Sequence, residues 1–67
     1  MTNYDIEIGA SNIVHLEATT RREIKELLKG KQGRVSVADN RTCEEIYFGT
    51  PEQVISLIDL DLEQGLV

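Results

Sequence analysis

Two helix-start signals, at Thr20 and Thr50, each follow a pair of segments in which apolar and polar residues alternate. In both, a Glu or Gln stands three residues after the threonine, the spacing of a capping box that satisfies two backbone N–H groups at the start of a helix. The order predicts a single small α+β domain over residues 1–67. We expect a two-layer ββαββα fold, with a four-stranded, mainly antiparallel sheet and both helices packed on one face.

The alternation also predicts where the elements lie. Tyr4, Ile6 and Ile8 are separated by acidic residues, which is typical of a strand with one buried face. We expect Ile46 and Phe48 to face the core in the same way. The four strands are expected over 4–8, 13–18, 34–38 and 43–48, with turns over 9–12 and 39–42 and helices over 20–29 and 51–64. The pairing order of the strands stays open.

A domain of 67 residues buries only enough apolar surface for marginal stability, so chains of this size often need a disulfide, a metal or a second subunit. This chain has one cysteine and one histidine, too few for a disulfide or a structural zinc site. Self-association remains, and we expect a homo-oligomer with no cofactor and no metal. The free cysteine and the absence of an apolar leader at residues 1–5 predict a cytoplasmic protein.

Catalysis needs reactive groups that converge, and the spacing of this sequence brings none together. No nucleophile or cofactor signature surrounds His15 or Cys43. We interpret His15 as a solvated residue on the outer face of the sheet and Cys43 as a small, partly buried strand residue. The sequence therefore predicts a protein that is not an enzyme.

The net charge of −5 is unevenly distributed along the chain. All seven basic residues lie between positions 21 and 41, whereas six of the twelve acidic residues follow position 41. We therefore expect positive and negative side chains on separate surfaces of the molecule. Three hypotheses follow from this expectation.

The leading hypothesis is a small acidic interaction module that docks on a basic partner protein and inhibits or regulates it. Two leucines of the second helix lie off its core-facing stripe and could form an apolar contact with Leu66 and Val67, steered by nearby carboxylates. Whether these leucines face the core or an interface stays open. Inhibitors encoded by phages and other mobile elements can work in this way, by offering carboxylates where a nucleic acid would present phosphates. The expected partner-binding residues are Leu57, Leu60, Glu52, Asp59, Asp61 and Glu63.

Two alternatives remain. The first helix carries cations at intervals of four residues, which predicts a basic ridge able to bind the phosphates of a nucleic acid. The low pI of about 4.6 argues against this hypothesis. The other alternative is a self-assembling structural or regulatory subunit, with Leu57 and Leu60 at a two-fold contact. The expected nucleic-acid-binding residues are Arg21, Arg22, Lys25 and Lys29.

Overall fold

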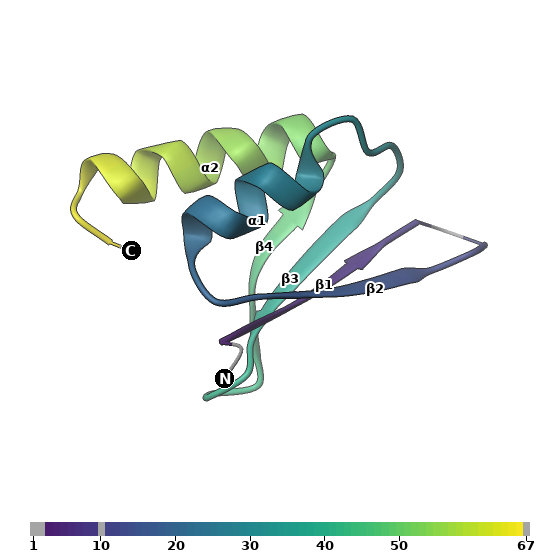
Figure 1. The fold of residues 1–67 in the computed structure, drawn as a ribbon, viewed down its shortest axis with the longest axis horizontal. Helices are drawn as coiled ribbons and strands as arrows, with labels where there is room; N and C mark the ends of the chain where they lie inside the picture. Colours follow the sequence, from purple (N-terminus) through teal and green to yellow (C-terminus); the bar gives the residue numbers. More distant parts are fainter. Residues whose placement is uncertain (1–2, 10, 67) are drawn as a thin grey trace.

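The protein folds as a four-stranded antiparallel sheet with two helices on one face (Figure 1). The computed structural model describes residues 3–9 and 11–66. The expected fold class is confirmed, and each element lies within about two residues of its expected bounds. The expected turn over 9–12 includes Ala10, which lies outside the described residues. The elements are β1 (Tyr4–Ile8), β2 (Val14–Ala18), α1 (Arg21–Leu28), β3 (Val35–Asp39), β4 (Glu44–Gly49) and α2 (Pro51–Glu63).

The strand order is β2-β1-β3-β4, so β1 and β3 form the centre and β2 and β4 form the edges. Ile6 of β1 lies opposite Leu16 on β2 and Val37 on β3, which places these three side chains on the same face. Both helices cover that face, as Figure 1 shows. No helix of the described residues lies on the other face, which we call the open face.

The core lies between the sheet and the two helices. The buried residues of α1 are Ile24 and Leu28, and those of α2 are Val54, Ile58 and Pro51 at its start. The spacing of four residues within each helix places these side chains on one face. Alternate strand residues complete the same layer. The buried hydrophobic residues of the sheet are Tyr4, Ile6, Ile8, Ala18, Val35, Val37 and Tyr47.

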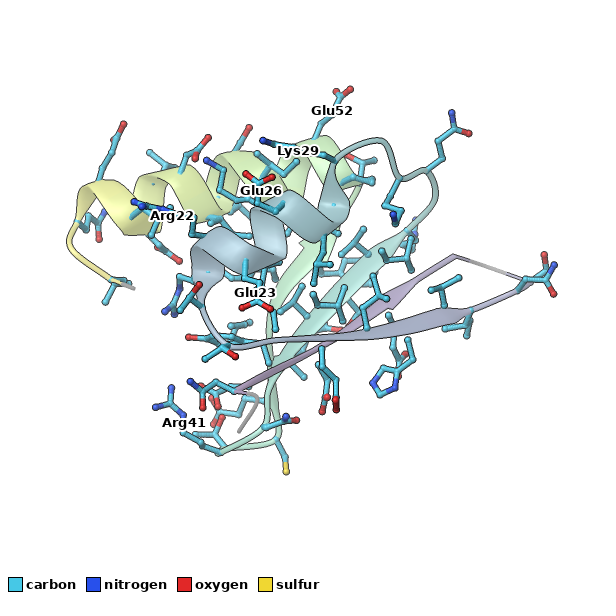
Figure 2. The ribbon with its side chains drawn as sticks, in the orientation of Figure 1. Arg22, Glu23, Glu26, Lys29, Arg41 and Glu52 are labelled. Carbon is cyan, nitrogen blue, oxygen red and sulfur yellow. The ribbon has the colours of Figure 1, made fainter. Side chains whose placement is uncertain are left out.

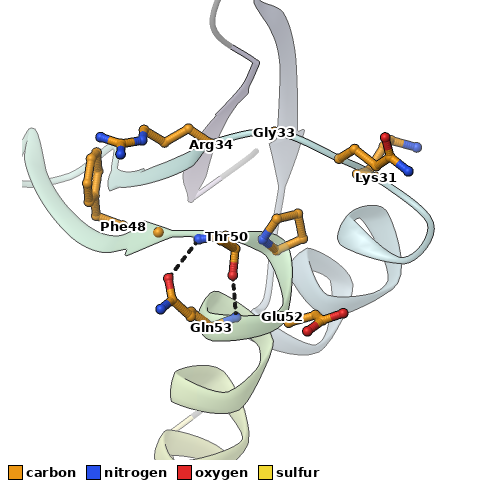
Figure 3. Close-up of a pocket in the computed structure, with 10 residues that line it drawn as sticks. Lys31, Gly33, Arg34, Phe48, Thr50, Glu52 and Gln53 are labelled. Carbon is orange, nitrogen blue, oxygen red and sulfur yellow. Dashed lines mark hydrogen bonds between the residues drawn. The ribbon is translucent and has the colours of Figure 1, made fainter.

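Both helix-start signals act as caps. The Thr20 hydroxyl accepts a hydrogen bond from the Glu23 backbone N–H at 3.2 Å, but the Glu23 carboxylate reaches the N–H of Thr19, not that of Thr20. At α2 the capping box is complete, because the Gln53 amide oxygen also accepts from the Thr50 N–H at 3.0 Å (Figure 3). The second signal is therefore the more regular of the two.

A β-bulge in β4 overturns one expectation for the core. Val37 pairs with Tyr47, and the next residue of β3, Ala38, pairs with Glu45, so Ile46 is the extra residue. The bulge shifts the alternation. Tyr47 therefore points into the core and Phe48 points away from it, with 51% of its surface exposed. The prediction that Phe48 faces inward was wrong, whereas Ile46 is partly buried against the core.

Candidate functional site

The two helices neutralise each other's charges where they meet. Lys25 of α1 forms an ion pair with Asp59 of α2, and the Arg21 Nε atom lies 3.7 Å from the Asp61 Oδ2 atom. The prediction that positive and negative side chains occupy separate surfaces was therefore wrong here. The prediction failed because α1 packs beside α2, which brings together charges that are far apart in the sequence (Figure 1).

Arg21 is the centre of a part-buried polar network. Its Nε atom donates to the Tyr47 hydroxyl at 2.8 Å and its Nη1 atom donates to the Tyr4 hydroxyl at 3.0 Å. The Tyr47 hydroxyl in turn donates to Asp61. Burial and this hydrogen bond to Asp61 raise the pKa of Tyr47 to about 12. The network joins the sheet to both helices, so Arg21 and Asp61 serve the fold and are poorly placed to bind a partner.

The expected basic ridge of α1 is largely neutralised. Besides the two pairs with α2, the Lys29 ammonium donates to the Glu26 carboxylate at 3.0 Å on the same helix (Figure 2). Arg22 is exposed, and among the described residues it has no ion pair within 4.0 Å. Three of the four expected nucleic-acid-binding residues thus hold carboxylates. A phosphate would have to compete with partners already in place.

The expected partner-binding residues of α2 divide into two groups. Asp59 and Asp61 are paired with α1, whereas Glu52 and Glu63 are exposed and form no ion pair with any described residue. Leu57 and Leu60 are 42% and 54% exposed, so they face solvent and not the core.

Phe48 lies beside the two leucines, because all three line one shallow hollow at the β4 edge. We call Phe48, Leu57 and Leu60 the apolar flank. Leu66 is 45% exposed but does not line this hollow, and Val67 lies outside the described residues. The apolar flank was only partly visible in the sequence, since the position of Phe48 depends on the bulge.

A second hollow lies between the 31–34 segment and the start of α2 (Figure 3). Lys31 and Arg34 border it, and the Arg34 guanidinium lies 5.2 Å from the centre of the Phe48 ring. A helix N-terminus with two cations nearby could suggest an anion site. Here the Thr50 hydroxyl already accepts from the Gln53 N–H, Pro51 has no N–H, and Glu52 adds a negative charge. The hollow is therefore a poor anion site.

The open face of the sheet gathers acidic side chains that are far apart in the sequence. Tyr4, Ile6 and Ile8 fill the core face of β1, so Asp5 and Glu7 point the opposite way. The register then fixes their neighbours on this face: Glu17 and Ala38 flank Asp5, and His15 and Ser36 flank Glu7. Residues of the open face are Asp5, Glu7, His15, Glu17, Ser36, Ala38, Glu45 and Phe48.

Four of these eight side chains are carboxylates, and the strands contribute no Lys or Arg to the open face. Arg34, just before β3, places its guanidinium over the Phe48 ring at one end of this face. Asp5 and Glu17 stand directly opposite each other, an arrangement that costs stability. The His15 Nε2 atom lies 3.7 Å from the Asp5 Oδ1 atom, and the Ser36 hydroxyl donates to Glu45. This acidic surface was missed by the sequence analysis, although the alternation around Ile6 and Leu16 already indicated it.

The candidate catalytic residues do not converge. His15 is exposed on the open face, as expected. Cys43 lies exposed in the turn before β4 with a φ of 60°, so the prediction of a partly buried strand residue was wrong. Among residues 3–9 and 11–66, no group of three or more His, Cys, Asp or Glu side chains could hold a metal ion.

Comparisons of the chain with protein-family models, with curated proteins and with solved structures found no match. In the described part of the chain, neither helix has the length and apolar character needed to cross a membrane.

Proposed function

We propose that this protein is a small acidic interaction module that docks on a basic partner protein through the open face of its sheet, without a catalytic step of its own. The observation that carries the proposal is the row of carboxylates formed by Asp5, Glu7, Glu17 and Glu45 on a face that no helix covers. The proposed binding surface thus differs from the α2 acids, because two of those are paired with α1. The proposed setting is the cytoplasm.

The opposition of Asp5 and Glu17 supports an external partner. Two carboxylates held face to face weaken the fold, and a cationic surface docked on them would remove that repulsion. Docking would act by occupation, since the partner's basic surface could no longer contact phosphates.

The apolar flank supports a protein as the partner. Phe48 belongs both to the open face and to this flank, so a single body could contact the carboxylates and the leucines together. Exposed aromatic and aliphatic side chains beside a charged surface are typical of interfaces in which charge guides encounter and apolar burial holds the complex.

The test uses a fluorescent deca-arginine peptide as the probe, with binding followed by anisotropy at low salt. We expect the wild type to bind and its affinity to fall as salt rises. Replacing Glu7 and Glu45 with lysine should weaken binding about tenfold, the effect of about 1.4 kcal/mol of lost attraction.

The matched control replaces Glu52 and Glu63 on α2 with lysine. Each pair of substitutions changes the net charge by +4, from −5 to −1, so a general charge effect would weaken both variants equally. If the α2 variant lost as much affinity for the peptide as the open-face variant, or more, the proposal would be overturned. Circular dichroism should show that both variants remain folded. Preferential binding of duplex DNA over the peptide by the wild type would also contradict the proposal.

A further inference from the structure

The edge strand β2 has little protection against pairing with another strand. Proteins usually block the free edge of a sheet with a bulge, a proline or a lysine. The β4 edge carries the bulge at Ile46. The β2 edge has a continuous register with β1, and its sequence Val14–Ala18 contains no bulge, proline or lysine, with Glu17 as its one acidic residue.

Hydrogen bonding shows which backbone groups of β2 face this edge. The Asn3 N–H donates to the Ala18 carbonyl, so this carbonyl of β2 points toward β1. The Gly9 N–H donates to the Arg34 carbonyl and the Asn3 carbonyl accepts from the Asn40 N–H, which indicates that the odd-numbered residues of β1 bond toward β3. The residues between them bond toward β2, where their partners are Val14, Leu16 and Ala18. The N–H and C=O groups of His15 and Glu17 therefore point outward from the sheet.

We propose that a second copy of this chain pairs with β2 in antiparallel orientation about a two-fold axis at Leu16. In this register His15 of each copy lies opposite Glu17 of the other, and each such pair can exchange both backbone hydrogen bonds. The result is one continuous sheet of two subunits.

Backbone hydrogen bonding and the side chains that lie opposite each other both favour this register over the neighbouring ones. If the second copy were shifted by one residue, the outward-pointing backbone groups of His15 and Glu17 would meet backbone groups that are already bonded to β1. The open faces of the two copies would also lie on opposite sides of the joined sheet. A two-fold axis at His15 pairs the two histidines with each other, and an axis at Glu17 pairs the two glutamates. Only the axis at Leu16 sets a carboxylate opposite an imidazole on both sides.

Apolar exposure supports the same contact. Ile13 is 62% exposed and Val14 is 49% exposed, although the β2 side chains Leu16 and Ala18 on the same face are partly or fully buried. Pairing about Leu16 sets Val14 opposite Ala18 of the second copy and brings the two Leu16 side chains together. The contact would cover apolar surface at the end of β2, a gain for a domain of this size.

This inference does not depend on the proposed function. Dimerisation is tested at His15 and Glu17, and docking is tested at Glu7 and Glu45, so one can fail without the other. If both hold, the two open faces join into one longer acidic surface.

The first experiment is sedimentation equilibrium of the wild type and three variants. We expect a monomer–dimer equilibrium for the wild type. His15→Glu, which sets glutamates opposite each other, should raise the dissociation constant at least about tenfold. The double variant His15→Glu with Glu17→Lys sets a glutamate opposite a lysine at both positions and should return the constant to near the wild-type value. His15→Lys should lower it.

The second experiment is amide hydrogen exchange of the wild type at rising protein concentration. The amides of His15 and Glu17 should become protected as dimers form, whereas those of Leu16 and Ala18 should be protected throughout. A strict monomer at about 100 μM, far above a working Kd of 1 μM, would overturn the proposal. A dimer in which the His15 and Glu17 amides stay unprotected would overturn it too.

Discussion

Charged side chains are arranged in opposite ways on the two sides of the sheet. On the helix side, Arg21 and Lys25 of α1 meet Asp61 and Asp59 of α2, so opposite charges cancel where two elements pack. On the open face, Asp5 lies opposite Glu17, so like charges gather on a side that neither described helix covers. The difference indicates that the first set stabilises the fold, and that the second set lowers its stability and is free to act on a partner.

The largest expected effect is on the helix side. Arg21→Met removes the cation that holds Asp61 and donates to two tyrosine hydroxyls, leaving those groups part-buried without it. We expect a loss of about 2–3 kcal/mol in the free energy of unfolding, measured by urea denaturation. The neighbouring Arg22→Met is the matched control, and because Arg22 is exposed it should change stability by less than about 0.5 kcal/mol. Equal effects of the two substitutions would show that the network contributes nothing.

The second expected effect concerns alkaline pH. The pKa of Tyr47 is raised from 10.0 to about 12, so the folded state favours the neutral phenol. The neutral phenol therefore contributes to the free energy of unfolding. This contribution is fully present below the pKa of Tyr47 in the unfolded state and is lost as pH rises through its pKa in the folded state. The free energy of unfolding should therefore fall between about pH 10 and pH 12. The Tyr47→Phe variant should be less stable than the wild type at neutral pH, but it should lack the part of the decline that comes from Tyr47. The part that comes from lysine titration should be the same in both proteins. Parallel curves for the two proteins would contradict the prediction.

Much of the fold could be predicted from the sequence because its signals are local. The capping box at Thr50, the apolar stripes and the alternation in β1 each depend on residues a few positions apart. The bulge at Ile46 is different, because it depends on how β4 pairs with β3, and it reversed the expected orientation of Phe48.

The candidate site was harder to predict for the same reason. Periodicity places Asp59 on one side of α2, but it does not show that Lys25 of α1 lies next to it. The expected charge separation failed at that contact. The acids of the open face needed less information, since the alternation in β1 and β2 already places Asp5, Glu7 and Glu17 opposite the core. Only Glu45 required the register of a third pair of strands.

The smallest expected effect is of opposite sign and lies on the open face. Glu17→Gln removes one of two carboxylates that face each other, so it should raise the free energy of unfolding by about 0.5 kcal/mol, whereas Arg21→Met lowers it. The measurement is urea denaturation at a protein concentration well below the working Kd of about 1 μM for the dimer, where self-association contributes least. The gain should shrink in 1 M NaCl, because salt screens the repulsion between exposed groups. A loss of stability, or a gain that salt does not reduce, would mean that Asp5 and Glu17 do not repel each other, and the distinction between the two sides of the sheet would then fail.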